Sequence, residues 1–369
     1  MNKIYVTRPL LPKFDALEKH LKEIWETQWL TNMGDKHNQL ETKLKKELKV
    51  PNLSLFNNGT IALLTAIKAL DLPYGSEVIT TPFTFPATPH CIVWNGLKPV
   101  FCDIEPNTMT IDANKIENLI TPNTSAILGV HVYGFPCDVN KIDKIAKKHN
   151  LKVIYDAAHC FSTEIGSKGI GNFGDITMFS FHATKLFNTI EGGCLTYRDP
   201  KLSKVIYNLR NFGIQNEETV EAVGINGKLN EVQAAVGIEN LKIYRQEQNR
   251  RSKIKKFYDS NISKIKGIRV PKMPKNVTNS YQYYPIIIEK DYPISRDCLY
   301  EKFKKINVLT RKYFYPSCND YDCYKNYLSV KLADLTNTND IKKKVLCLPY
   351  YGSLQKSDLE KIVKVLKGI

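Results

Sequence analysis

Residues 179–193, FSFHATKLFNTIEGG, place a single lysine, Lys185, between two apolar runs. The runs on either side, residues 175–181 and 194–197, are typical of buried strands. Burial strips water from an ammonium group, lowers its pKa and makes the amine a nucleophile toward carbonyls, as in Schiff bases with pyridoxal phosphate. Taken alone, Lys185 is more simply explained as a solvated loop residue, because charged side chains mostly lie on surfaces.

Around this stretch, strand and helix patterns alternate with short links. Such alternation predicts an α/β fold with a mostly parallel sheet covered by helices on both faces. Two helices, residues 14–30 and 37–48, are expected before the first strand. The expected strands are 53–56, 77–81, 99–104, 126–132 and 151–156, and the expected helices are 57–70, 87–94, 113–119 and 139–149.

The chain has 369 residues, which suggests about two domains. A long helical pattern at 229–263 reads as a connector between them. Beyond it a separate α+β unit is expected, so we predict a large domain at 1–250 and a small C-terminal domain at 251–369. Its expected strands are 281–288, 308–315 and 345–348, and its helices 295–306 and 357–366.

Polar residues follow several of the predicted strands. In parallel sheets, ligands collect at the carboxyl ends of the strands. Asp156 ends one strand, and Gly59-Thr60 begin a helix after another. Each has an ordinary structural explanation as a helix cap. Together with Lys185 they supply the imine-forming amine, the carboxylate for the ring nitrogen and the phosphate cradle that pyridoxal phosphate needs.

Two more residues extend this predicted site. Ser180 lies five residues before Lys185, so its hydroxyl could contact the phosphate. Phe85 follows another strand and could stack on a flat ring, although a lone aromatic is more often a core residue.

The balance of 53 Lys and Arg against 37 Asp and Glu gives a net charge of +16. The lysines are scattered over helical patterns, so we do not expect a nucleic-acid partner. A positive surface also suits an anionic substrate.

Nine cysteines are present without a CxxC pair, which predicts neither a metal site nor a disulfide framework. Residues 1–14 lack the apolar run of a signal peptide, and no window reaches the ~18 apolar residues of a membrane helix. We therefore expect a soluble, cytoplasmic protein.

A series of motifs in family order spans nearly the whole chain: WLTNMG, NNGT, TPFTFPAT, PVFCDIEPNTMTID, HVYGFPCDV, VIYDAAH, FSFHATK, EGG, GINGKLNE and YFYP. In these motifs the chain resembles the sugar-nucleotide aminotransferases of the DegT/DnrJ/StrS family. The resemblance implies a fold-type I pyridoxal 5′-phosphate enzyme with a central, mostly parallel seven-stranded sheet. It also implies a homodimer with shared active sites.

The same resemblance implies roles for individual residues. Lys185 would form the Schiff base and move protons, Asp156 would pair with the ring nitrogen, and His159 would lie beside the phenolic oxygen. The remaining cofactor contacts would come from Phe85 on the ring and from Gly59, Thr60, Ser180 and, across the dimer, Asn226 on the phosphate. Lys228 stands where many members have arginine, and Cys160-Phe161-Ser162 also departs from the family pattern. Lysine at 185, rather than histidine, favours transamination over the dehydrating branch.

Within the family, the motifs look most like enzymes that aminate C4 of a nucleotide-linked 4-keto-6-deoxy-D-glucose, giving viosamine for polysaccharides such as O-antigen. L-Glutamate would be the amino donor, and the nucleotide would be dTDP or UDP. Candidate substrate contacts are Thr31, Asn32, Arg311, Lys312, Tyr313 and Tyr315.

Three alternatives stay open at this point. Enzymes that make 3-amino sugars or the galacto epimer of the 4-amino sugar share the fold and cofactor. A non-catalytic pyridoxal-binding protein and a basic nucleic-acid-binding module are further possibilities.

Overall fold

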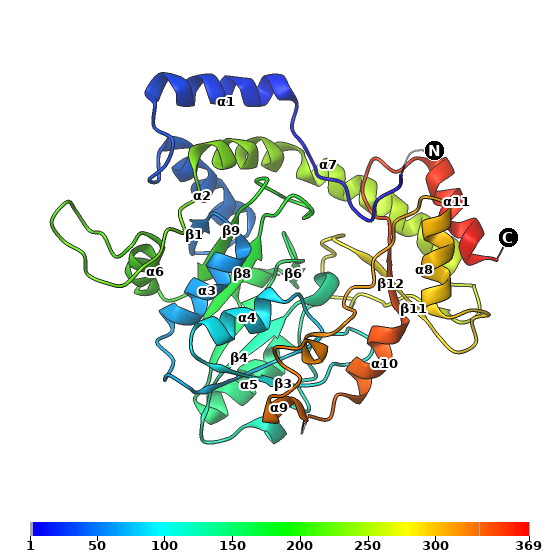
Figure 1. Ribbon diagram of the computed structural model, residues 1–369. Coiled ribbons are helices and arrows are strands. Elements are labelled where there is room, and N and C mark those ends of the chain that lie inside the picture. Colours follow the sequence, from blue (N-terminus) through cyan, green and yellow to red (C-terminus); the bar gives the residue numbers. More distant parts are fainter. Residues whose placement is uncertain (1–2, 332, 369) are drawn as a thin grey trace.

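A computed structural model describes residues 3–331 and 333–368 of the chain (Figure 1). Its centre is a seven-stranded sheet in the order β1-β9-β8-β5-β4-β2-β3. All neighbouring strands are parallel except β9, which runs antiparallel to β1 and β8. This confirms the predicted mostly parallel sheet. The strands are β1 Asn52–Phe56, β2 Glu77–Thr80, β3 Lys98–Phe101, β4 Thr124–Val130, β5 Lys152–Asp156, β8 Ile176–Ser180 and β9 Gly193–Tyr197.

Helices cover both faces of this sheet because successive strand residues point to opposite sides. Leu128 and Ile154 pack with helices α3 and α4 on one face. Their neighbours Ile127 and Val153 pack with α5 on the other. The helices of this part of the chain are α3 Gly59–Ala69, α4 Ala87–Trp94, α5 Val139–His149 and α6 Leu202–Arg210. A small hairpin, β6 Glu164–Ile165 with β7 Lys168–Gly169, lies outside the main sheet.

The two N-terminal helices, α1 Phe14–Thr27 and α2 Asp35–Glu47, pack against the first half of α7 (Figure 1). Glu231, in the first turn of α7, accepts the backbone N–H groups of Lys36 and His37 at 2.7 and 3.0 Å. A carboxylate at the start of α2 accepts hydrogen bonds from backbone N–H groups that have no acceptor within the helix, and its negative charge complements the helix dipole. These contacts fix the loop containing Thr31 beside the start of α7.

Helix α7, Glu231–Ile262, runs from the large sheet to the C-terminal unit and confirms the expected connector (Figure 1). That unit is built on an antiparallel sheet in the order β10-β11-β12. Ile4 also belongs to its core and pairs with Val308. The elements are β10 Ile268–Arg269, β11 Tyr284–Ile288, β12 Val345–Leu348, α8 Arg296–Lys305, α9 Leu328–Lys331, α10 Thr336–Lys344 and α11 Lys356–Leu366. The domain boundary at 250 falls inside α7 and stays a prediction.

Two predicted elements are wrong. The stretch 113–119 is a turn followed by a short 3₁₀ helix, Glu117–Leu119. The Asp112 carboxylate accepts both the backbone and side-chain N–H groups of Asn114, and such local bonds compete with a regular helix.

The stretch 308–315 forms only isolated bridges, from Val308 to Ile4 and from Arg311 to Cys347. The chain then turns before Pro316, which restricts the preceding backbone. Within residues 3–331 and 333–368, further 3₁₀ helices are η2 Val132–Gly134, η3 Ile170–Asn172 and η4 Cys318–Asp320.

Among residues 3–331 and 333–368, no helix is both long and apolar enough to cross a membrane. Over the same residues, no three His, Cys, Asp or Glu side chains gather in a way that could hold a metal ion.

Candidate active site

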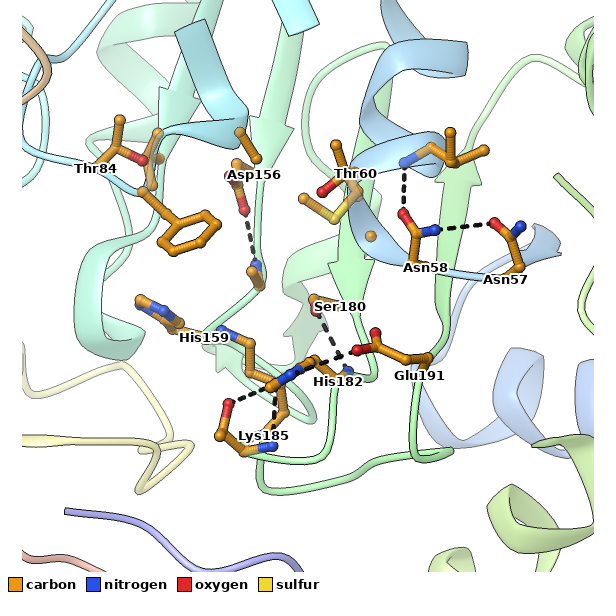
Figure 2. Close-up of a pocket in the computed structure, with 18 of the residues that line it drawn as sticks. Asn57, Asn58, Thr60, Thr84, Asp156, His159, Ser180, His182, Lys185 and Glu191 are labelled. Carbon is orange, nitrogen blue, oxygen red and sulfur yellow. Dashed lines mark hydrogen bonds and ion pairs between the residues drawn. The ribbon is translucent and has the colours of Figure 1, made fainter. Parts of the chain in front are cut away.

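A pocket of about 980 Å³ opens where the carboxyl ends of β1, β2, β4, β5 and β8 meet (Figure 2). β9 contributes its amino end to the same rim, because it runs antiparallel and pairs Gly193 with Phe56 and Ser180. Most of the residues predicted for the site line this pocket. They are Thr31, Gly59, Thr60, Phe85, Asp156, His159, Ser180, Lys185, Asn226 and Tyr313.

Four predicted substrate contacts do not line the pocket: Asn32, Arg311, Lys312 and Tyr315. Lys312 pairs with Asp297. The Tyr315 ring instead packs 5.0 Å from the Arg296 guanidinium. The roles predicted for these residues remain predictions.

Lys185 lies in the loop that joins β8 to β9. The loop is closed by backbone bonds from Phe181 to Gly192 and from Thr189 to Phe181, and its Leu186 N–H donates to Gln282 at 2.7 Å. Burial lowers the pKa of Lys185 to about 8, although the charge of Asp156 acts in the opposite direction. No side chain in the described part of the protein bonds to its Nζ, so the amine is available to a ligand.

Asp156 ends β5 and is held in one orientation by two donors. Its Oδ1 accepts the Ala158 N–H at 3.0 Å (Figure 2). Its Oδ2 accepts the Thr88 hydroxyl, also at 3.0 Å. Burial raises the pKa of Asp156, whereas these bonds and the Lys185 charge lower it. The carboxylate is therefore buried, oriented and able to balance a positive charge in the pocket.

The start of α3 forms a phosphate-sized cradle. Asn58 caps the helix by accepting the Ile61 N–H at 2.8 Å. The first amides, on Gly59 and Thr60, have no intrahelical acceptors because they begin the helix. Ser180 closes the other side: a Cβ on Gly59 would lie 3.0 Å from its Cβ and 3.2 Å from its Oγ. Backbone amides, a hydroxyl and a helix dipole together favour an anion.

An aromatic wall supports His159. Its Nδ1 accepts the Tyr133 N–H at 3.0 Å, which leaves the Nε2–H as donor. The ring lies parallel to Phe314, with centroids 6.3 Å apart, and edge-on to Tyr283 at 4.9 Å. Burial and the Lys185 charge lower the pKa of His159, so the imidazole stays neutral. Phe85, by contrast, is 60% exposed, so its ring is accessible to a flat ligand in the pocket.

Several pocket residues were not predicted from the sequence. His131 directly follows β4, and Asp156 ends the neighbouring strand β5, so the rule of strand ends would have found His131 too. His182 and Glu191 lie on either side of Lys185 in sequence, with Nε2 and Oε1 3.5 Å apart (Figure 2). Asn230 and Gln233 come from the first turn of α7, where Asn230 is the N-cap. Their place in the pocket depends on how α7 packs, which no local pattern encodes.

The residues present fit pyridoxal phosphate on three independent observations. The pocket contains a desolvated amine without a partner, an oriented buried carboxylate and an anion cradle with free amides. These are the three groups that hold the aldehyde, ring nitrogen and phosphate of that cofactor.

Comparison with known proteins agrees with this chemistry. The model of the DegT/DnrJ/EryC1/StrS aminotransferase family matches residues 15–367. A dTDP-4-amino-4,6-dideoxy-D-glucose transaminase of Shigella dysenteriae is 43% identical over 366 residues, which cover 99% of each chain. A protein of the same name from Escherichia coli is 44% identical over 368 residues, covering 99% of this chain and 98% of the relative.

Solved structures give the same result. The crystal structure of DesI in the presence of its TDP-sugar product superposes with a TM-score of 0.93 at 31% identity, covering 100% of this chain and 93% of DesI. Helicobacter pylori PseC, an aminotransferase of pseudaminic acid biosynthesis, superposes with a TM-score of 0.92 at 27% identity, covering 99% and 98%.

Proposed function

Because this chain belongs to the DegT/DnrJ/EryC1/StrS aminotransferase family, we propose that it transfers the amino group of L-glutamate to C4 of dTDP-linked 4-keto-6-deoxy-D-glucose. Pyridoxal 5′-phosphate would be the cofactor and the 4-amino-4,6-dideoxy-glucose nucleotide the product. The names of the two relatives that are 43% and 44% identical over nearly their full lengths support this substrate.

The observation that carries the proposal is the unpartnered amine of Lys185 in the same pocket as the Asp156 carboxylate. A buried lysine that served only stability would have a partner, because an isolated buried charge is costly. With a pKa of about 8, about one tenth of the amine is neutral at pH 7, which is enough to attack a carbonyl.

When bound, pyridoxal phosphate would supply an aldehyde for amine exchange and a ring that takes up the electron pair released at the reacting carbon. Asp156 would hold a negative charge beside the ring nitrogen and so favour its protonated form. Gly59, Thr60 and Ser180 would bind the phosphate, and Phe85 would cover one ring face. The fixed phosphate and ring would leave little freedom for the reacting atoms.

Proton transfer would fall to Lys185. Once its Nζ is released by the incoming amine, it can accept the proton from the donor carbon in the first half-reaction, and it can deliver a proton to the sugar carbon in the second. The closed β8–β9 loop holds this amine over the pocket for both half-reactions. His159, neutral and oriented by the Tyr133 amide, would donate its Nε2–H to the ring oxygen.

The direct test combines spectroscopy with product analysis. Purified protein given pyridoxal phosphate should show a yellow absorbance band that borohydride abolishes and that Lys185→Ala lacks. With L-glutamate and dTDP-4-keto-6-deoxy-D-glucose, NMR should show an equatorial amino group at C4. A colourless protein, amination at C3 or an axial C4 amine would contradict the proposal, and the UDP-linked sugar provides the comparison for nucleotide preference.

We also propose that two copies share their active sites through the loop between α6 and α7 that carries Asn226. Asn226 itself lines the pocket of its own chain, so its reach to the partner's phosphate stays a prediction. The loop between α6 and α7 projects from the body of the molecule and exposes Val220 and Val223, the latter by 91% (Figure 1). Such apolar exposure suits a protein contact. Sedimentation should give twice the chain mass of 42.2 kDa, and a monomer with full activity would exclude shared sites.

A further inference from the structure

A buried glutamine, Gln282, holds the backbone on both sides of Lys185. It lies shortly before β11, is 2% exposed and is not one of the described residues that line the pocket. Its Nε2 donates to the Thr184 carbonyl at 2.9 Å, and its Oε1 accepts the Leu186 N–H at 2.7 Å. The chemistry proposed above gives this side chain no role.

The two hydrogen bonds restrict the direction in which the Lys185 side chain leaves its loop. The Thr184 carbonyl belongs to the peptide group before the Lys185 Cα, and the Leu186 N–H belongs to the peptide group after it. Each peptide group is planar, so holding both of them restricts the two backbone torsions of Lys185. The carboxamide thus makes contacts like those of a neighbouring strand, in a segment that lies between β8 and β9.

The backbone that presents Gln282 has an uncommon conformation of its own. Tyr281 has a φ of 55°, in the left-handed region that residues other than glycine rarely adopt. Its N–H donates to the Asn279 Oδ1 at 2.6 Å, and its carbonyl accepts the Arg251 Nη1 at 3.2 Å. Such conformations persist where the surrounding contacts determine them, and they cluster at functional sites. These contacts fix the turn from which Gln282 extends toward Lys185.

We propose that Gln282 is a positioning residue that holds Lys185 in the geometry needed to attack the cofactor and to transfer protons. This inference rests on the proposed function and adds to it the group that orients the reacting amine. A misplacement of about 1 Å can lower the rate of a reaction about 100-fold, so the backbone torsions of this lysine bear directly on its chemistry.

The same contacts bear on the protonation of Lys185. Burial lowers the pKa of this lysine to about 8, and its burial depends on the loop staying closed. An open loop would readmit water and return the pKa toward its ordinary value. A glutamine that only stabilised the fold would leave this pKa unchanged in any variant that still folds.

The test follows the capture of pyridoxal phosphate by cofactor-free protein, with stopped-flow absorbance between pH 6 and 10. Gln282→Met nearly keeps the length of the side chain and removes both hydrogen bonds. The pH midpoint of the capture rate should rise by about one unit, because water reaches the ammonium group. The limiting rate at high pH should fall about tenfold, since the neutral amine is no longer held in one direction.

A second measurement gives L-glutamate to the cofactor-loaded protein under single-turnover conditions. The rate constant of Gln282→Met should fall about tenfold, and the half-saturating glutamate concentration should stay within about threefold, because the side chain lies outside the pocket lining. A loss confined to the half-saturating concentration would assign Gln282 to binding and overturn the inference.

Gln248→Met provides the matched control. The Gln248 Nε2 donates to the Asn279 carbonyl at 3.2 Å and to the Ser162 Oγ at 3.3 Å, so it anchors the segment before Gln282 without bonding to the loop of Lys185. Its pH midpoint and limiting rate should equal those of the wild type. Gln282→Asn, whose shorter side chain cannot reach both peptide groups, replaces the Met variant if the thermal midpoint shows that the latter does not fold.

An unchanged pH midpoint and limiting rate in a folded Gln282 variant, or equal changes in Gln248→Met, overturn the inference. The two levels of proposal fail differently. If the wild-type protein captures no pyridoxal phosphate, the proposed function is wrong. If the wild type captures it and Gln282→Met does so with the same rate and midpoint, only the positioning role is wrong.

Discussion

Lys185 and Asp156 are two buried, oppositely charged groups that influence each other's pKa. Removal of water lowers the pKa of the amine to about 8 and raises that of the carboxyl group, while their attraction opposes both shifts. The residual shift of Lys185 leaves it nucleophilic near neutral pH. Because Asp156 is fixed by two hydrogen bonds, its charge stays in place when the amine moves.

The rate at which cofactor-free protein captures pyridoxal phosphate should follow the neutral form of Lys185. Only the unprotonated amine attacks, so the rate should rise nearly tenfold per pH unit up to about pH 7.5 and level off above the pKa of about 8. Stopped-flow absorbance between pH 6 and 10 measures this. A rate that still climbs tenfold per unit beyond pH 9 would mean that Lys185 has an ordinary pKa.

Asp156→Asn should lower kcat by about 10²- to 10³-fold, because the site loses the charge that favours a protonated ring nitrogen. Thr88→Val removes one hydrogen bond to the carboxylate but keeps the charge, so its loss should be about tenfold. Steady-state kinetics with the amino donor compares the two. Equal losses in both variants would show that orientation, and not charge, is what Asp156 contributes.

At the scale of elements, the cap of α3 links local folding to ligand binding. Asn58 satisfies the Ile61 amide and so sets the direction in which the free amides of Gly59 and Thr60 point. Asp138 does the same for α5 by accepting the Lys141 N–H at 3.0 Å, but that helix end lies away from the pocket.

Asn58→Ala and Asp138→Ala should each cost about 1 kcal/mol of unfolding free energy, since both remove an N-cap. Only Asn58→Ala should also weaken pyridoxal phosphate binding, by about tenfold. Urea unfolding of the apoprotein and fluorescence titration of the cofactor separate the two effects. If both variants lose cofactor affinity equally, the cradle has no special dependence on its own cap.

The sequence was most informative where a pattern is local. Helices α4 and α5 begin and end at the residues predicted, and the strand ends with Asp156 and Ser180 were placed correctly within a residue. The helix at 113–119 was wrong because side-chain bonds from Asp112 compete with it. The strand at 308–315 was wrong because its partners, Ile4 and Cys347, lie far away in the chain and each supplies a single bridge.

The site itself was predictable only in part, for the same reason. Lys185, Asp156 and Gly59 each lie at or soon after the carboxyl end of a strand, so one rule about sheets brings them together. Lys228 and Gln233 reach the pocket through the packing of α2 on α7 and through the irregular segment 227–230. The spacing of residues along the sequence does not predict these tertiary contacts.

At the scale of the whole molecule, a buried ion pair within α7 also forms hydrogen bonds to the C-terminal unit. The Arg251 Nε donates to Glu247 at 2.7 Å, and its Nη1 donates to the Tyr281 carbonyl at 3.2 Å. Glu247 also accepts the Gly352 N–H at 2.7 Å. The connector helix is therefore bonded to the segment that enters β11 and to the segment that leaves β12, at one end of the small sheet.

Arg251→Met should destabilise the protein by about 3–5 kcal/mol, because it leaves the Glu247 carboxylate buried without its cation. The double variant Arg251→Met with Glu247→Gln should recover part of that loss. Urea unfolding, followed by circular dichroism, gives both values. A double variant no more stable than Arg251→Met alone would show that the pair acts through packing.

The antiparallel strand β9 has a consequence for synthesis of the chain on the ribosome. β1 leaves the ribosome early, yet its one neighbour in the sheet is β9, so its backbone has no strand partner until residues 193–197 have been made. Gly59 packs on Gly193 at that same junction. Nascent chains that end before β9 should therefore be unable to retain cofactor, and they should depend on chaperones to cover an unfinished sheet edge.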